Sequence, residues 1–288
     1  MIAILLNSIF VVVEFGYGFF AHSTALMADA GHNLSDVLGL VLAGSATLLA
    51  RRGPSQRFTY GLRSTSILAA LGNAMLLLLA CGAIGLEALQ RLAHPPAVAS
   101  VTVMLVSLLG IAVNGVSAWL FMAGRKGDLN IRGAYLHMAS DALISLAVVI
   151  AAVVMMYTGW YWLDPVVSLA IVAVIVVGTW SLLRESVQLA LNAVPAHIDV
   201  TAVEQHLRQL EGVSDVHDLH IWGMSTTESA LTVHLVMPEG YPGDGAIDSI
   251  AQSLAKRFAI HHSTLQVERG TTQHACSLGV AAAALHTH

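Results

Sequence analysis

Charged residues are scarce in this chain of 288 residues: Asp, Glu, Lys and Arg make up 11% of it, against about 25% in ordinary soluble domains. This scarcity excludes a single soluble globule. Basic residues do not exceed acidic ones, and because the formal net charge is −5, nucleic acid is not an expected partner. Only two cysteines are present, Cys81 and Cys276, which is too few for the disulfide framework of a small secreted domain.

Apolar residues, by contrast, make up 56% of the chain and occur in long runs. Crossing a hydrocarbon core takes about 20 consecutive apolar residues. Six such runs are present, at 1–20, 26–50, 65–92, 100–123, 131–157 and 164–183. The first run lacks the basic start and the small-residue cleavage site of a signal peptide. We therefore predict an α-helical membrane protein with six transmembrane helices in a transport domain over residues 1–190.

The last third of the chain has a different composition, because residues 195–288 hold 10 of the 14 His and 10 of the 18 acidic residues. Its periodicity predicts a helix at 199–211, strands at 213–222 and 229–237, a helix at 245–260 and a strand at 264–268. The order αββαβ is typical of one sheet covered on one face by two helices. We predict this domain for residues 195–270 and a disordered, His-containing tail for 271–288.

The basic residues between the runs predict which way the protein faces. The loops after the second and fourth runs and the segment after the sixth hold eight basic residues, and the opposite loops hold only Arg91. Because cytoplasmic loops carry an excess of Lys and Arg, this asymmetry places both termini and the soluble domain in the cytoplasm. The eight residues are Arg51, Arg52, Arg57, Arg63, Arg125, Lys126, Arg132 and Arg184.

Two of the predicted spans contain the same pattern of ionisable residues: His32-x-x-x-Asp36 in the second and His137-x-x-x-Asp141 in the fifth. An ionisable group at membrane depth costs about 2.5–3.5 kcal/mol on insertion scales, so it indicates a function. A spacing of four puts both side chains on one helix face. Asp36 lies about 18 Å and Asp141 about 16 Å along its span. Both depths are near the middle of a core about 30 Å thick, so we expect the four residues to converge.

Two nitrogen and two oxygen ligands suit a tetrahedral zinc ion, with Cd²⁺ and Co²⁺ as alternatives. A single His or Asp on such a helix is more often a hydrogen-bonding group between helices, but two matched pairs favour a metal site. Asp29, nearer the outer end of its span, is interpreted as a capping or vestibule group. Glu14 is interpreted as a helix-packing residue or part of a wet cavity.

A metal site at the middle of the membrane is typical of transporters that alternate access around a fixed position. Protons compete with the metal for these side chains, because the metal binds only neutral His and ionised Asp. We therefore predict a proton-coupled antiporter that exports Zn²⁺. A passive divalent-metal channel and an intramembrane metalloenzyme are the alternatives. Channels need several weak sites along a pore, and the zincin motif His-Glu-x-x-His is absent from the sequence.

Five segments resemble the cation diffusion facilitator family of zinc-exporting antiporters, in order along nearly all of residues 1–268. The resemblance implies six transmembrane helices, a metallochaperone-like αββαβ domain, a homodimer and a multi-pass location in the bacterial inner membrane. It makes His32, Asp36, His137 and Asp141 the transport site, with Zn²⁺ as substrate and no other cofactor. The segments are Ala25–Asp36, Phe58–Arg63, Asn130–His137 with Asp141, Trp162–Pro165 and Val216–Trp222.

The same resemblance implies a second, regulatory metal site in the cytoplasmic domain. Three His and one carboxylate would again suit zinc, although surface His residues are common without a metal. His220 is not expected to share an ion with His217, because an odd spacing puts two residues of a strand on opposite faces. The implied ligands are His217, His234, His261 and Glu268, with His262 as the alternative to His261.

Overall fold

The computed structural model describes residues 2–50, 52–122 and 129–271. The predicted tail, with Cys276, therefore lies outside the described residues apart from its first position, and so do Arg51, Arg125 and Lys126. The chain divides into two compact units. The first comprises residues up to 44 together with 70–183, and the second comprises 45–69 together with the residues from 184 onward.

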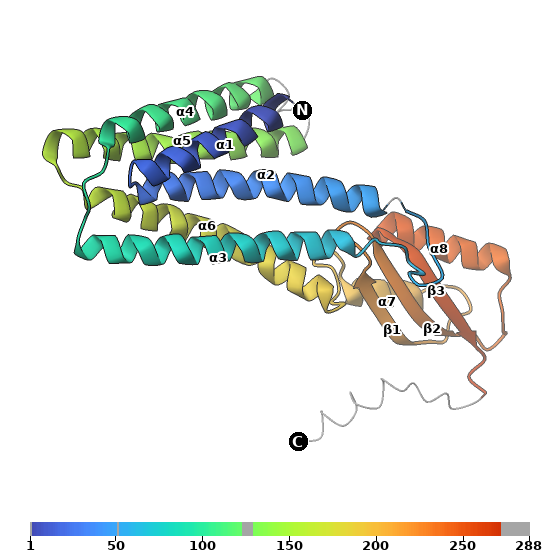
Figure 1. Ribbon diagram of the computed structural model, residues 1–288. Coiled ribbons are helices and arrows are strands. Elements are labelled where there is room, and N and C mark those ends of the chain that lie inside the picture. Colours follow the sequence, from blue (N-terminus) through green and yellow to red (C-terminus); the bar gives the residue numbers. More distant parts are fainter. Residues whose placement is uncertain (1, 51, 123–128, 272–288) are drawn as a thin grey trace, which may run out of the picture. The chain divides into compact units, whose positions relative to one another are not determined.

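Six long helices occupy the places of the six predicted spans, which confirms the predicted fold class (Figure 1). Four of them contain stretches that are long and apolar enough to cross a membrane, in α3, α4, α5 and α6. The described apolar part of α1, Ser8–Phe20, is shorter. The helices are α1 Ile2–Phe20, α2 Thr24–Ala50, α3 Thr65–Ala93, α4 Ser100–Met122, α5 Leu129–Thr158 and α6 Leu163–Ala190.

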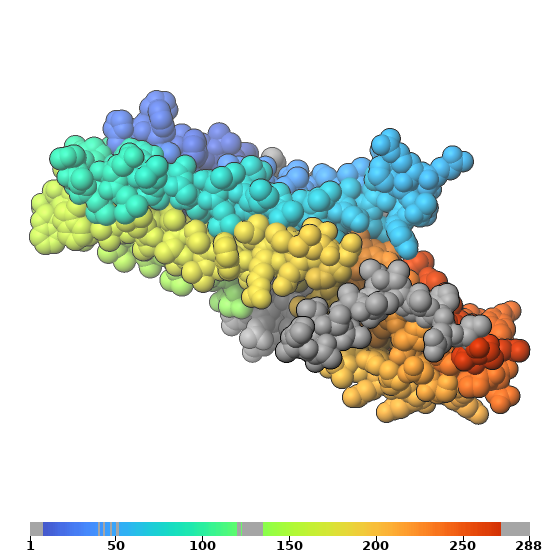
Figure 2. Space-filling model, turned by 90° about the horizontal axis from the view of Figure 1, so that it is seen from below, coloured from blue at the N-terminus to red at the C-terminus, as the bar shows by residue number. Residues whose placement is uncertain are grey.

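Helices α3 and α6 expose many large apolar side chains, as a helix that faces lipid does. Both helices contribute to the face seen in Figure 2. Leu79 of α3 is 69% exposed and Val177 of α6 is 76% exposed. Such exposure would be costly in water over two whole helices. The membrane interpretation of the composition therefore agrees with the surface of these helices.

The core of the first unit joins α1, α2, α4, α5 and α6 through buried apolar residues that include Phe10, Leu26, Val103, Val148 and Ile171. Close packing of α1, α4 and α5 depends on a glycine. A Cβ atom at Gly110 of α4 would lie 2.8 Å from Phe10 Cζ and 3.1 Å from Ser145 Oγ. A larger residue at this position would push these helices apart.

A carboxylate from α6 caps the start of α2. Asp164 Oδ2 accepts hydrogen bonds from the backbone N–H of Thr24 at 2.6 Å and from its hydroxyl at 2.8 Å, and Asp164 Oδ1 accepts one from Ser23 at 2.5 Å. Ser168 of α6 donates to the backbone oxygen of Thr24. The first N–H groups of a helix have no partner within it, and a negative group there also meets the positive end of the helix dipole. These contacts fix the start of α2 against α6.

The cytoplasmic part has the expected order of elements. It contains α7 Val200–Arg208, β1 Asp215–Gly223, β2 Ser229–Val236, α8 Asp244–Phe258 and β3 Ile260–Glu268. The strands form one sheet in the order β1-β2-β3, with β1 antiparallel and β3 parallel to β2. Strand β3 begins four residues earlier than the predicted 264, because Ala259 (φ 57°) ends α8 in a left-handed conformation and extended backbone follows at once.

We predict that Asp164→Ala lowers the thermal stability of the purified protein, because it leaves buried donors at the start of α2 without an acceptor. Loss of a cap costs about 1 kcal/mol, and each unsatisfied buried group adds about 1–3 kcal/mol. Thermal unfolding in detergent measures the effect. Glu185→Ala is the control, because Glu185 is exposed on the same helix. Equal midpoints for the two variants would contradict the capping role.

Candidate metal centres

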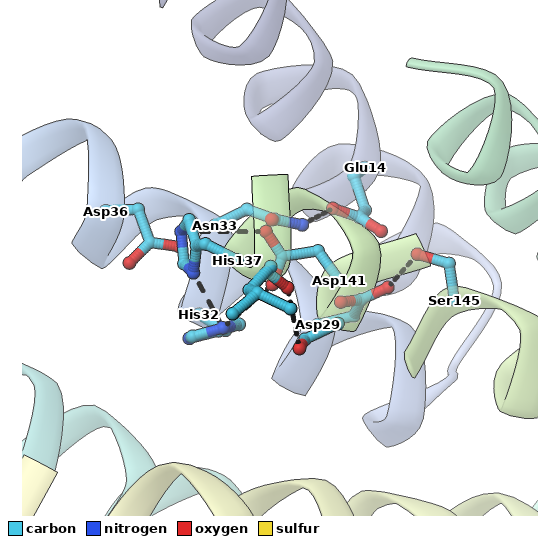
Figure 3. A network of polar contacts seen from close by, with 10 residues as sticks. Glu14, Asp29, His32, Asn33, Asp36, His137, Asp141 and Ser145 are labelled. Carbon is cyan, nitrogen blue, oxygen red and sulfur yellow. Dashed lines mark hydrogen bonds and ion pairs between the residues drawn. The ribbon is translucent and has the colours of Figure 1, made fainter. Parts of the chain in front are cut away.

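The four residues of the repeated pattern meet between α2 and α5 (Figure 3). One ligand atom from each of His32, Asp36, His137 and Asp141 can be chosen so that all four lie within 4.8 Å of one another. The shortest contacts run between the helices: His32 Nε2 lies 3.3 Å from Asp141 Oδ1, and His137 Nε2 lies 3.2 Å from Asp36 Oδ2. Within each helix the imidazole and the carboxylate are 3.9 Å and 3.6 Å apart. The predicted convergence is thus present in the structure.

These separations fit tetrahedral coordination. With bonds of about 2.0–2.2 Å, the ligand atoms of a tetrahedral zinc ion lie roughly 3.3–3.6 Å apart. The four measured nitrogen–oxygen distances, 3.2, 3.3, 3.6 and 3.9 Å, extend only slightly beyond this interval. Asp141 makes its two contacts with different oxygens, and one ligand atom from each of the four residues lies within 4.8 Å of the others, so the cluster has the size of a single metal site.

The burial of the four residues is uneven. The side chain of Asp141 is 1% exposed, whereas those of His32 and Asp36 are 19% and 25% exposed and that of His137 is 41% exposed. Both carboxylate oxygens of Asp141 and Oδ2 of Asp36 are buried without a hydrogen-bond donor. Buried acceptors normally have a partner, and a divalent cation between these oxygens would provide one. The side chain of His137 is the most exposed of the four.

A second polar group, which the sequence interpretation did not recognise as a unit, lies beside these ligands (Figure 3). Asn33 Nδ2 donates to Glu14 Oε2 at 3.1 Å, and Ser145 Oγ donates to Asp29 Oδ2 at 2.9 Å. Asp29, interpreted from the sequence as a capping or vestibule group, lies within α2, is fully buried and is bonded to α5. The spacing Asp29, His32, Asp36 places successive polar residues on neighbouring turns, and this was the available sequence signal.

The cytoplasmic domain contains a smaller cluster with one residue from each strand of its sheet. His217 of β1 pairs with His234 of β2, and Glu268 lies at the end of β3. Glu268 Oε1 lies 2.8 Å from His234 Nδ1, and Glu268 Oε2 lies 3.3 Å from His217 Nε2. One ligand atom from each of the three lies within 4.8 Å of the others. The structure therefore brings together three of the four implied ligands.

The expected fourth ligand does not lie with them. His261 and its alternative His262 stand at the start of β3, seven and six residues before Glu268, or about 20 Å and more along an extended strand. They line a cavity of about 370 Å³ together with Tyr60 and Arg63. The resemblance alone implied His261 as a ligand, whereas in the structure β3 already begins at Ile260 and holds His261 and Glu268 at opposite ends.

The predicted orientation of His220 was wrong, although the cluster of His217, His234 and Glu268 does not include it. The pairing of β1 with β2 shifts between His217 and His220, so that they lie opposite His234 and Thr232, which share one face of the sheet. Asp218 makes the bulge with a φ of 51°. Such a bulge adds one residue to a strand, so that two residues three positions apart point to the same face of the sheet. His220 Nε2 lies 3.2 Å from Asp218, which in turn lies 3.6 Å from His234 Nε2.

Comparisons with known proteins agree with this architecture. The family model "Cation efflux transmembrane domain" matches residues 1–189, and the model "Cation efflux protein, cytoplasmic domain" matches residues 195–270. The chain belongs to the cation efflux family. This confirms the resemblance to the cation diffusion facilitators, and the chain is a membrane cation transporter. The alternative of an intramembrane metalloenzyme is therefore wrong.

The cation efflux protein is also similar to curated relatives along most of its length. It is 34% identical to a cadmium, cobalt and zinc/H(+)-K(+) antiporter of Bacillus velezensis, over 95% of this chain and 89% of the relative. It is 35% identical to the metal cation efflux system protein CzcD of Cupriavidus metallidurans, over 93% and 85%. It is 33% identical to the zinc transporter ZitB of Escherichia coli, over 90% and 83%.

We expect His217→Ala to bind about one zinc ion fewer per chain than the wild type, because metal binding at such a cluster needs all of its few ligands. His261→Ala should keep the wild-type stoichiometry, since His261 lies at the other end of β3. Metal analysis of the purified protein after equilibration with zinc measures both. Equal losses in the two variants would show that His261 is a ligand after all.

Proposed function

We propose that this cation efflux protein exports Zn²⁺ from the cytoplasm in exchange for protons. The observation that carries the proposal is the meeting of His32, Asp36, His137 and Asp141 between α2 and α5. Two nitrogen and two oxygen ligands favour zinc over the calcium and magnesium ions, which prefer oxygen alone. The names of the relatives support this choice and keep Cd²⁺ and Co²⁺ as alternatives.

The position of the site along its helices supports transport. Asp36 lies twelve residues after Thr24, where α2 begins, and Asp141 lies twelve residues after Leu129, where α5 begins. At 1.5 Å per residue each carboxylate is about 18 Å from its helix start. If the helices cross a core about 30 Å thick in opposite directions, both carboxylates lie near its middle. A site at this depth is reached from each side in turn when helices rock around it.

Proton coupling follows from the ligands themselves. The imidazoles bind a metal only when neutral and the carboxylates only when ionised, so proton and zinc exclude one another. Zinc arriving from the cytoplasm displaces protons from the site. Protons from the more acidic outer side then displace zinc, and the cycle repeats.

The remaining parts of the proposal concern placement and control. Both termini lie on the cytoplasmic side of a bacterial inner membrane in this proposal, which the excess of basic residues after the second, fourth and sixth helices supports. The protein acts as a homodimer, which the match to the cytoplasmic domain model supports. Zinc at His217, His234 and Glu268 acts as a regulatory ligand, because an ion that binds one conformation better shifts the population toward it.

Asp36→Ala and Asp141→Ala should each abolish zinc-dependent proton movement in reconstituted vesicles. Removal of a partner that only orients a metal ligand costs about 10–100-fold, so loss of a ligand should cost more than about 100-fold. A pH-sensitive dye inside the vesicles reports proton movement after zinc is added. Glu87→Ala is the control, since Glu87 is paired with Arg91 at the far end of α3. Full activity of either Asp variant would refute the site, and zinc flux without proton movement would indicate a channel.

His234→Ala should raise the zinc concentration for half-maximal transport by about tenfold without abolishing transport, because the variant loses a regulatory ligand and keeps the transport site. Initial rates over a series of zinc concentrations give the half-maximal value. His220→Ala is the matched control on the same face of the sheet. An unchanged zinc dependence in His234→Ala would argue against regulation at this cluster.

A further inference from the structure

Glu14, Asp29 and Asn33 form a buried polar group beside the proposed transport site, all of them 0% exposed (Figure 3). Each has a buried oxygen without a hydrogen-bond donor: Oε1 of Glu14, Oδ1 of Asp29 and Oδ1 of Asn33. Their other polar atoms are bonded, to one another or to Ser145. The two carboxyl groups are close enough to interact electrostatically. Buried acceptors normally have a partner, and a cation held between these oxygens would provide one.

The surrounding helices do not supply this charge. No Lys or Arg occurs in α1, α2 or α4, and Arg132 of α5 lies more than three turns from Ser145 along its helix. The titratable groups that face this region are Glu14 of α1, three residues of α2 and two of α5, while α4 has none. Two carboxyl groups cannot both be ionised in such surroundings without a counter-cation. The α2 and α5 residues are Asp29, His32, Asp36, His137 and Asp141.

The donor set selects the kind of cation. It consists of oxygen atoms alone, from two carboxyl groups and one amide, and no imidazole or thiol takes part. Zinc prefers nitrogen and sulfur ligands in proteins, whereas hard cations prefer oxygen. The group therefore suits a hard monovalent cation better than a second zinc ion.

We propose that Glu14 and Asp29 hold the counter-cation that leaves when the metal binds, a hard monovalent cation coordinated or shared by their oxygens. This inference rests on the proposed exchange at the His32–Asp141 site and adds a separate position for the exchanged ion. The cation is a proton or an alkali-metal ion, since both are hard and both bind oxygen. Asn33 of α2 positions the Glu14 carboxyl group, and Ser145 of α5 positions that of Asp29.

Proximity couples the two positions. Asp29 precedes His32 by three residues, so their side chains are neighbours on one face of α2, about 5–6 Å apart between Cβ atoms. A zinc dication and a monovalent cation about 6 Å apart repel at an effective dielectric constant of about 20 strongly enough to lower each affinity by a factor on the order of 10⁴. By reciprocity, the counter-cation weakens zinc binding by the same factor as zinc weakens counter-cation binding. The two ions therefore exchange instead of binding together.

The test measures zinc binding to the full-length protein in detergent by calorimetry, in buffers of different ionisation enthalpy and in KCl, NaCl or choline chloride. Glu14→Gln and Asp29→Asn keep the size of each side chain and remove its charge. If the ion is a proton, each variant should release about one proton fewer per zinc than the wild type. If it is an alkali ion, K⁺ or Na⁺ should weaken wild-type zinc binding about tenfold or more relative to choline, and the variants should lose this effect.

Glu87→Gln is the matched control and should behave as the wild type in every buffer. Zinc bound by the cytoplasmic cluster contributes equally in each variant and in the wild type, so it does not affect the difference between them. Glu14→Asp keeps the charge and should restore the wild-type behaviour, which separates loss of the ion from loss of the fold if Glu14→Gln is unstable. Wild-type proton release together with wild-type salt dependence in both Glu14→Gln and Asp29→Asn would overturn the inference. Failure of the transport site itself would appear differently, as wild-type zinc binding that Asp141→Asn does not weaken.

Discussion

Two carboxylates placed between apolar helices impose the constraint on which this structure depends. Asp36 and Asp141 are stable there only when α2 and α5 hold them against the imidazoles of the opposite helix, at 3.2 and 3.3 Å. The helices must therefore keep a fixed register. Ser145 supports it by bonding Asp29 one turn beyond Asp141. Close packing at Gly110 holds α4 against Ser145 of α5, and the Asp164 cap holds α2 against α6. Both contacts help to keep this register.

The parts of the structure that sequence predicts well are those encoded by local spacing. Apolar runs of membrane length give the six helices, and a spacing of four puts an imidazole and a carboxylate on one face of each of two helices. Nothing more than antiparallel packing is then needed to bring the two pairs together. The order αββαβ could likewise be predicted, because the alternation of apolar and polar residues in strands and the periodicity of helices are both local properties.

The parts that sequence reasoning missed depend on contacts between distant residues or on backbone irregularity. Asn33 bonds Glu14 from 19 positions away, Ser145 bonds Asp29 from 116, and Asp164 reaches Ser23 from 141. No periodicity reveals such pairs. The errors in the cytoplasmic domain have a different origin: the bulge at Asp218 returns His220 to the face of His217, and the early start of β3 carries His261 away from Glu268. One residue of register reverses the face in a strand.

The two candidate metal centres differ in the freedom of their ligands, and this difference matches the roles proposed for them. His217, His234 and Glu268 stand on three strands of one sheet, which hydrogen bonds hold at fixed spacing. The ligands of the first unit come from two helices, and among the described residues no backbone hydrogen bond joins these helices. An ion that must enter and leave in each cycle needs ligands that can part. An ion that stabilises one state of the dimer is better held by a rigid sheet, because its binding energy is then not spent on reordering the ligands.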